Sequence, residues 1–496
     1  MNKFVASRHV QPLLSLVFCC CLSAQAQAQA QTPTPSPPAG SKLQSLTQSP
    51  AAPSAPRALQ IQAWKTVTGT KVLFIQTSEL PMFDVLVSFA AGSARDPQHP
   101  ALAAATFSLL NERIQGKSLA QIKETFDGLG ARWGMGINHD RTWFSLRSLS
   151  APQKREPALQ LFAQMLGQPL LADDALLRVK SELLQIIESQ QQDPLTQVVR
   201  GMSGLLFNDH PYAQSVYGTT QDLATLTREQ VQAFHKANYH AGNTQITLVG
   251  DLTLDQAQAL SVQISNSLPV KPTALAVADI PVTPPTRTSR HIEQAQNQTH
   301  LMLAQPGVSR KHPDYVALKV ANLIFAGGSS GSRLMQELRE KRGLTYSVSM
   351  DTADKQWANP TVIYVQTQPQ FSEGTLTLIK SLFRDYLHTG PTSRELDDAK
   401  RLILGSTALA SASNAQILSG LSEISRHDLP FDLDFSAHQA QSLTVEQIKA
   451  ALNRHYNADH WSVVTLGPTT TQQALPEPVD RAGLGMCRAE EQIVAS

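Results

Sequence analysis

The pattern of apolar and polar positions predicts long amphipathic helices mixed with short strands. Apolar residues recur with helical spacing over residues 174–191, 228–238, 373–389, 393–410 and 445–455. Short apolar runs over residues 85–91, 245–249, 300–304 and 462–466 are typical of strands. Helices and strands do not alternate regularly, as they would in a doubly wound parallel sheet. The pattern therefore predicts an α+β fold in which helices pack on sheets.

The second part of the chain repeats the first at an offset of 217 positions. Three landmarks share this offset: Leu226 and Leu443, Tyr239 and Tyr456, and Gly250 and Gly467. In both copies a helix leads through the tyrosine and a polar turn into an apolar strand. Near the start of each copy a strand precedes a His-Pro pair, at positions 99–100 and 312–313. This register predicts a duplicated α/β-sandwich domain of about 200 residues.

Composition divides the chain into six segments. Residues 1–30 have a basic start and an apolar run that is too short to span a bilayer, which predicts a cleaved export signal and a periplasmic protein. Residues 31–57 are a Pro/Ser/Thr-rich linker. The two domains are predicted over residues 58–265 and 292–473, with a linker over 266–291 and a tail over 474–496.

Charge and cysteine content exclude some classes of function. The chain has 41 Lys and Arg against 40 Asp and Glu, and no basic run is interleaved with aromatic residues, so nucleic acid is not an expected partner. No segment after the signal is long and apolar enough to be a membrane helix. Three of the four cysteines lie in the signal, leaving only Cys487, so no internal disulfide is expected. A lipid anchor at the signal cysteines is the weaker alternative.

A Gly/Ser-rich stretch over residues 327–350 holds the candidate site. Its pattern predicts a loop that begins with Gly327 and Gly328, a short helix, a stop at Gly343 and a strand over residues 345–350 that includes Tyr346. Periodicity alone is equally compatible with an ordinary loop–helix–strand connection.

Residues 338–346, Leu-Arg-Glu-Lys-Arg-Gly-Leu-Thr-Tyr, resemble the Arg/Tyr motif of insulinase/pitrilysin-type zinc peptidases. The resemblance implies that two similar domains face each other across a cavity. It also implies that Arg339 and Tyr346 bind the substrate and act in catalysis. Gly327 and Gly328 would border the substrate chamber.

The metal motif of that family is absent from this sequence. Active members carry His-x-x-Glu-His on the helix after the first strand, where two histidines bind zinc and the glutamate activates water. The matching positions hold Ala104, Phe107 and Ser108. His235 and His240 are too far apart for one helical face and are expected to be half-exposed, and Glu182 and Glu188 are expected on a solvated helix. We therefore expect no metal or other cofactor in this chain.

Loss of the metal motif with retention of the Arg/Tyr motif resembles the divided peptidases of the family. The expected function is that of a non-zinc-binding, substrate-holding subunit of an exported heterodimeric peptidase that acts on peptides. Zinc is then expected in a homologous partner subunit. The alternatives are an inactive family member with a structural or assembly role and a peptide-binding module without a partner. Retention of both Arg339 and Tyr346 favours the first function, because a structural protein does not need the pair.

Overall fold

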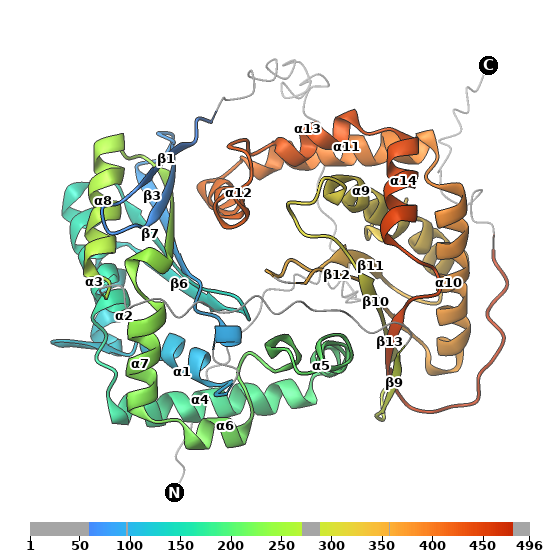
Figure 1. The fold of residues 1–496 in the computed structure, drawn as a ribbon, viewed down its shortest axis with the longest axis horizontal. Helices are drawn as coiled ribbons and strands as arrows, with labels where there is room; N and C mark the ends of the chain where they lie inside the picture. Colours follow the sequence, from blue (N-terminus) through green and yellow to red (C-terminus); the bar gives the residue numbers. More distant parts are fainter. Residues whose placement is uncertain (1–58, 96–97, 270–287, 357, 480–496) are drawn as a thin grey trace, which may run out of the picture. The chain divides into compact units, whose positions relative to one another are not determined.

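Two mixed sheets with helices packed on them form the fold (Figure 1). The computed structural model describes residues 59–95, 98–269, 288–356 and 358–479, which belong to one compact unit of the chain. The predicted signal, the Pro/Ser/Thr-rich linker, most of the second linker and most of the tail lie outside the described residues. Within the described ranges, every helix is too short or too polar to cross a membrane.

The first half of the fold is built on a six-stranded sheet with the order β1-β2-β8-β3-β7-β6. Its strands are β1 (Gln62–Lys65), β2 (Lys71–Gln76), β3 (Met82–Phe89), β6 (Arg132–Ile137), β7 (Thr142–Leu149) and β8 (Thr244–Gly250). A small separate hairpin joins β4 (Arg113–Ile114) and β5 (Lys117–Ser118). The helices of this half are α1 (Leu102–Leu109), α2 (Leu119–Leu129), α3 (Pro152–Gly167), α4 (Asp173–Gln192), α5 (Pro194–Phe207), α6 (Thr220–Thr225), α7 (Arg228–Asn238) and α8 (Leu254–Ser267).

The second half is built on a five-stranded sheet with the order β11-β12-β10-β13-β9. Its strands are β9 (Ser289–Glu293), β10 (Thr299–Pro306), β11 (Val348–Thr352), β12 (Pro360–Thr367) and β13 (Ser462–Gly467). The helices are α9 (Tyr315–Ala326), a π-helix over Met335–Glu340, α10 (Ser372–Thr389), α11 (Ser393–Ala410), α12 (Asn414–His427), α13 (Phe435–Ser442) and α14 (Val445–His455).

The two sheets have the same topology, which confirms the predicted duplication. Strands β2, β8, β3, β7 and β6 of the first sheet correspond in order to β9, β13, β10, β12 and β11 of the second. In each sheet the first of these pairs is parallel and the other three pairs are antiparallel. Helices α7 and α14 also begin alike, because Thr227 with Gln230 and Thr444 with Gln447 each form a capping box. The expected α+β fold with two similar α/β-sandwich domains is therefore observed.

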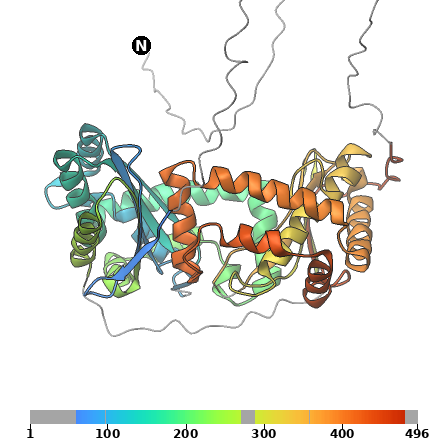
Figure 2. The same cartoon turned by 90° about the horizontal axis from the view of Figure 1, so that it is seen from above.

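One helix of each half packs on the sheet of the other half. Helix α12 lies on strands β2, β8 and β3, and helix α5 lies on β13 and β10. The view from above shows α12 beside the strands of the first half (Figure 2). Each helix packs on the sheet of the other half through apolar side chains. These are Ile417, Leu418, Leu421 and Ile424 of α12, and Val198, Met202 and Leu206 of α5. The central strands of each sheet are therefore buried on both faces, which explains why the four central residues of strand β2 are all apolar.

Candidate functional site

The Arg/Tyr segment begins where helix α9 ends and reaches edge strand β11. Leu334, Met335 and Leu338 are buried in the core of the second half, as their helical spacing predicted. Gly343 has the expected positive φ of 63° after the last turn. The helix is a π-helix, whereas the sequence indicated an ordinary helical turn. Short π-helical segments often occur at functional sites because the extra residue changes the direction of its side chains.

Arg339 and Tyr346 lie together, although seven positions separate them. The guanidinium carbon of Arg339 is 4.8 Å from the centre of the Tyr346 ring. Tyr346 is 80% exposed, and Arg339 is a weak ion-pair partner of Glu340 at 3.6 Å. A cation over an exposed aromatic ring is worth about 0.5–1 kcal/mol, so this contact favours the observed arrangement of the two side chains.

The prediction that Tyr346 belongs to a strand is wrong. Strand β11 begins at Val348, and Tyr346 lies in the turn before it. Thr345 holds this turn, since its side chain accepts from the Ser347 amide and donates to the Ser347 carbonyl. Tyr346 is therefore not braced by sheet packing, and the ring contact with Arg339 replaces the support that the strand was expected to provide.

Arg342 has a different environment from Arg339. Its Nη1 donates to Oε2 of Glu337 at 2.5 Å and to the Glu337 carbonyl at 3.1 Å. Lys341 binds Oε1 of the same carboxylate at 2.5 Å. Burial raises the pKa of Glu337, but the hydrogen bonds from Lys341 and Arg342 outweigh it and lower the pKa overall. Glu337 thus ties Arg342 to the π-helix, and Arg339 is left facing Tyr346.

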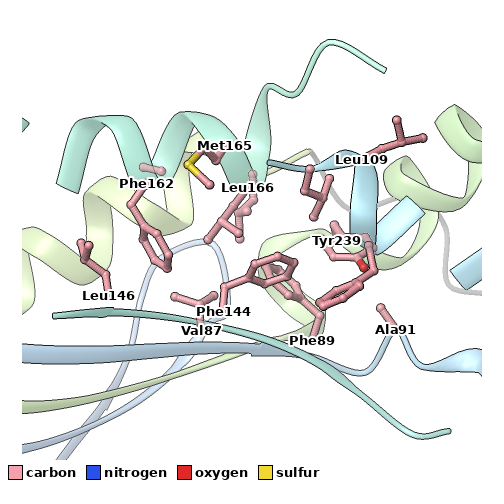
Figure 3. Packing of buried hydrophobic residues seen from close by; sticks show 14 of the residues in the cluster. Val87, Phe89, Ala91, Leu109, Phe144, Leu146, Phe162, Met165, Leu166 and Tyr239 are labelled. Atoms are coloured by element: carbon pink, nitrogen blue, oxygen red, sulfur yellow. The ribbon is translucent and has the colours of Figure 1, made fainter. Parts of the chain in front are cut away.

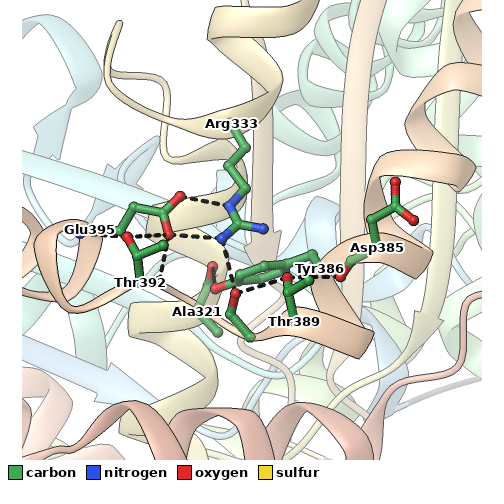
Figure 4. A network of polar contacts seen from close by, with 8 residues as sticks. Ala321, Arg333, Asp385, Tyr386, Thr389, Thr392 and Glu395 are labelled. Atoms are coloured by element: carbon green, nitrogen blue, oxygen red, sulfur yellow. Dashed lines mark hydrogen bonds and ion pairs between the residues drawn. The ribbon is translucent and has the colours of Figure 1, made fainter.

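Arg333 anchors the start of this segment (Figure 4). Its Nε and Nη2 donate to the two carboxylate oxygens of Glu395 at 2.6 and 2.8 Å, and Nη2 also donates to the Gly390 carbonyl at 2.9 Å. The same guanidinium lies 4.5 Å from the centre of the buried Tyr386 ring, whose hydroxyl donates to the Ala321 carbonyl. This bidentate pair joins the π-helix to helices α10 and α11. The sequence pattern did not single out Arg333, because its carboxylate partner is 62 positions away.

The two glycines of the candidate site have structural roles. Gly327 ends helix α9 and forms a bridge to Ser349 of strand β11. A Cβ there would lie 2.4 Å from the side chain of Leu323, so only glycine fits. Gly328 has a positive φ of 75° with open space beside it. Gly327 therefore adjoins the edge strand that follows Tyr346. The contact of Gly327 and Gly328 with substrate stays a prediction.

Helix α1 has no metal-binding side chain at the positions of the family motif. Ala104 is fully buried, and Phe107 packs on Phe144 with ring centres 5.5 Å apart. Figure 3 shows this core, in which Phe144 lies beside Phe89 and Tyr239 below helix α1. A methyl group, a phenyl ring and the hydroxyl of Ser108 do not fit a zinc site, which needs imidazole, thiolate or carboxylate ligands. Apolar packing has taken the place of the metal centre.

The other histidines and carboxylates considered in the sequence have structural surroundings. Glu182 and Glu188 are exposed on helix α4, as predicted. His235 and His240 are buried rather than half-exposed. His235 stacks on Tyr239 and its Nε2 is 2.9 Å from the Leu166 carbonyl, and burial lowers its pKa.

One group in the described part of the chain has the spacing of a metal site, namely His312, Asp314 and His455. Hydrogen bonds among these three residues account for the short distances between them. His455 Nε2 is 2.7 Å from Asp314 Oδ2, which also pairs with Arg454, and His312 Nδ1 accepts from the Asp314 amide. A similar hydrogen bond occurs at another His-Pro pair, outside the repeat, where His210 Nδ1 accepts from the Tyr212 amide. The group therefore holds the start of helix α9 against the end of α14.

Comparison with known proteins identifies relatives over most of the chain. The family described as Peptidase M16 inactive domain matches residues 225–403. The crystal structure of a peptidase M16 inactive domain from Pseudomonas fluorescens is 44% identical, has a TM-score of 0.81, and covers 84% of this chain and 100% of its own.

Two more distant relatives differ in their names. The non-peptidase homolog YmxG of Helicobacter pylori is 21% identical over 387 residues, which are 77% of this chain and 88% of the relative. An uncharacterized zinc protease of Mycobacterium bovis is 25% identical over 392 residues, which are 76% and 86% of the two chains. These relatives confirm the resemblance that the Arg/Tyr motif indicated. The chain is similar to the inactive domains of the peptidase M16 family, to which the insulinase/pitrilysin-type Arg/Tyr motif also points. The chain therefore belongs to the peptidase M16 family.

Proposed function

We propose that this chain is the zinc-free, substrate-holding subunit of an exported two-chain peptidase. The observation that carries the proposal is the exposed Arg339–Tyr346 pair, kept in a chain whose helix α1 has no metal ligand. An exposed tyrosine oriented by an arginine has no evident role in packing. Binding to a peptide, with the metal in a homologous partner subunit, gives both residues a use.

The chemistry of the two side chains suits the two parts of the task. Hydrolysis of a peptide bond places negative charge on the carbonyl oxygen, and a tyrosine hydroxyl can donate a hydrogen bond to that charge. The guanidinium of Arg339 can hold a backbone or carboxylate oxygen of the peptide by charge-assisted hydrogen bonds. Neither group has to be in the same chain as the metal.

The test uses a reconstituted pair of this chain and a family member with an intact His-x-x-Glu-His motif. A short fluorogenic peptide is the substrate, and kcat and KM are measured for each variant. Tyr346→Phe removes one hydrogen-bond donor and should lower kcat by about a hundred- to a thousand-fold, the usual effect of losing one oxyanion donor. Arg339→Ala should raise KM as well, because it removes the peptide contact and the support of the Tyr346 ring.

Arg342→Ala is the matched control. Arg342 is in the same segment but its guanidinium is already bound to Glu337, so this variant should keep nearly full activity. Melting temperature and subunit association should stay unchanged in Tyr346→Phe, since only one exposed oxygen is removed. Full activity of Tyr346→Phe would rule out the shared site and support an assembly role, which is compatible with the name of the non-peptidase relative.

A further inference from the structure

Two cavities lie side by side between helix α12 and the first sheet. One has a volume of about 340 Å³ and the other of about 400 Å³, and they share Arg141, Gln245 and Arg426 as lining residues. The smaller cavity has an apolar part formed by Leu86, Trp143, Ala415 and Leu418. The rest of its lining is polar and includes Glu423, which pairs with Arg310 at 3.0 Å. The larger one is lined mainly by charged side chains. Together they have the size of a site for a small organic ligand or a peptide end.

The larger cavity has an excess of positive charge. Six of its lining residues are cationic and three are aspartates; the cations are Arg95, Arg141, Arg310, Lys311, Lys355 and Arg426. All three aspartates already have partners. Asp428 pairs with Lys71 and Lys311, Asp354 with Arg426 and His427, and Asp140 accepts from the Tyr212 hydroxyl and the Gln356 amide.

Two of these cations have no carboxylate within ion-pair distance among the described residues. Arg141 donates to the hydroxyl and the carbonyl oxygen of Ser88, at 2.7 and 3.1 Å, and both acceptors are neutral. Lys355 lies 3.4 Å from His139 Nδ1 and over the Tyr212 ring. Removal from water, and next the charges of Arg426 and Arg95, lower the pKa of Arg141 to about 10. Partial burial also lowers the pKa of Lys355, although Asp140 opposes this.

Further N–H groups at the same cavity have no acceptor. The Nε of Arg426 and the Nη1 of Arg310 are buried without a hydrogen-bond partner in the described part of the chain. Buried polar groups are almost always paired, and cations removed from water without an anion are costly. Arg426 and Arg310 are themselves paired with Asp354 and Glu423, so within the described ranges the cations without a carboxylate are Arg141 and Lys355. The surroundings of Arg141 and Lys355 therefore correspond to a site whose anion is supplied by a ligand.

We propose that the two adjoining cavities bind the C-terminal carboxylate of a short peptide whose last side chain is apolar. The carboxylate would lie between Arg141, Arg426 and Lys355, and the side chain would enter the cavity beside Leu86, Trp143 and Leu418. The inference that the ligand has a carboxylate next to an apolar group rests on the residues that line the two cavities. The choice of a peptide as its source rests on the proposed function.

The test measures binding to the intact chain without any partner subunit. The probe is a tetrapeptide that ends in leucine and carries a fluorophore on its N-terminus, prepared as the free acid and as the C-terminal amide, and binding is followed by anisotropy. The free acid should bind at least about tenfold more tightly than the amide, because charge-assisted hydrogen bonds to the guanidinium are lost in the amide. Equal affinities would overturn the proposal.

Variants locate the effect in the cavity. Arg141→Met and Lys355→Met should each reduce the preference for the acid by about tenfold, and both are first checked for an unchanged melting temperature. Arg132→Met, an exposed position without an ion pair on strand β6, is the control and should keep the full preference. A preference that survives in both cavity variants would show that the carboxylate binds elsewhere.

Two further arms separate this site from the proposed function and from other carboxylates. In the first arm the acid is bound by this chain alone, with no zinc-bearing partner and no cleavage, so an inactive reconstituted pair would refute the peptidase proposal without removing this binding. Hexanoate has a carboxylate and an apolar tail but no peptide group, and it should compete at least about tenfold more weakly than the peptide acid. Equally strong competition by hexanoate would overturn the assignment to a peptide.

Discussion

Three arginines within ten positions of the chain have three separate roles. The role of each arginine depends on how strongly a carboxylate binds it. Arg333 is held by Glu395 and supports the segment, while Arg342 is bound to Glu337 and closes the π-helix. Arg339 has only a 3.6 Å contact with Glu340 and stays available beside Tyr346. A guanidinium whose N–H groups are already hydrogen-bonded to a carboxylate has fewer donors left for a ligand. The guanidinium of Arg339 is thus available because the nearby carboxylates Glu395 and Glu337 are bound by Arg333 and Arg342.

Glu395 provides the first prediction at the scale of residues. Burial raises its pKa, but the hydrogen bonds from Arg333 and Thr392 outweigh burial and lower the pKa overall. A lowered carboxylate pKa stabilises the fold above the ordinary pKa of glutamate, about 4.3, and this stability is lost as the pH falls through the folded value. Glu395→Gln should therefore reduce stability by about 1–3 kcal/mol at pH 7.

Thermal unfolding at several pH values measures this effect. The difference between Glu395→Gln and the natural chain should be largest at neutral pH and shrink as the pH drops below about 4. Glu124→Gln, on an exposed face of helix α2, should show no difference at any pH. A deficit in Glu395→Gln that stayed constant with pH would mean that packing, not the charge, explains the loss.

At the scale of elements, the exchanged helices α5 and α12 decide which surfaces are buried. The repeat predicts two similar domains, each with its own sheet, but it does not say that each sheet is covered by a helix from the other copy. Helix α5 approaches closely at Gly201, where a Cβ would lie 3.2 Å from Ile292 and Val464. The two halves therefore share their cores, and neither sheet is covered on both faces without the other half.

Leu421 of helix α12 tests this coupling. It is fully buried against strands of the first half, so Leu421→Ala should destabilise the protein by about 2–5 kcal/mol, as other large-to-small core substitutions do. The readout is the midpoint of chemical or thermal unfolding. Leu404→Ala on helix α11 is the matched control, because Leu404 is 51% exposed and should cost little. Similar losses from both variants would contradict the packing described for α12.

At the scale of the whole molecule, the chain is predicted to lack a bound metal. Ala104, Phe107 and Ser108 supply no ligand, so the purified mature protein should contain far less than one equivalent of zinc by elemental analysis and should cleave no peptide by itself. A family member with the intact motif, purified alongside, is the positive control. Stoichiometric zinc that disappeared in His455→Ala would place a metal at the His312 group and refute the prediction.

Export is the second prediction at this scale. The mature N-terminus should lie between Gln27 and Gln31, in the later part of the alternating Ala-Gln segment that offers small-residue cleavage sites. Mass spectrometry of the protein from the periplasmic fraction measures this directly. A lipidated cysteine at the N-terminus would instead make the protein membrane-anchored, and an intact Met1 in the cytoplasmic fraction would refute export altogether.

Local patterns in the sequence determined much of the fold. Helices α7, α11 and α14 have the bounds that periodicity predicted. Helix α4 is one residue longer at each end than predicted, and α10 is one residue longer at its start. The reason is physical: amphipathic spacing and Ser/Thr caps act over a few residues, so they can be read without the tertiary structure. The duplication was equally visible, because the same caps and strands recur in register. The lost metal motif and the Arg/Tyr pair were identified through the resemblance to the peptidase family.

The tertiary structure alone decided what those elements do together. It placed Tyr346 in a turn before β11, exchanged α5 and α12 between the halves, and brought Arg141 to Arg426 across 285 positions of the chain. Contacts of this kind depend on distant partners, as the pairing of Arg333 with Glu395 illustrates. The periodicity of apolar residues indicates which face of a helix or strand a side chain lies on. It does not indicate which residue from another element contacts that side chain. For that reason the residues of the candidate site could be named from the sequence, whereas their pairing and support could not.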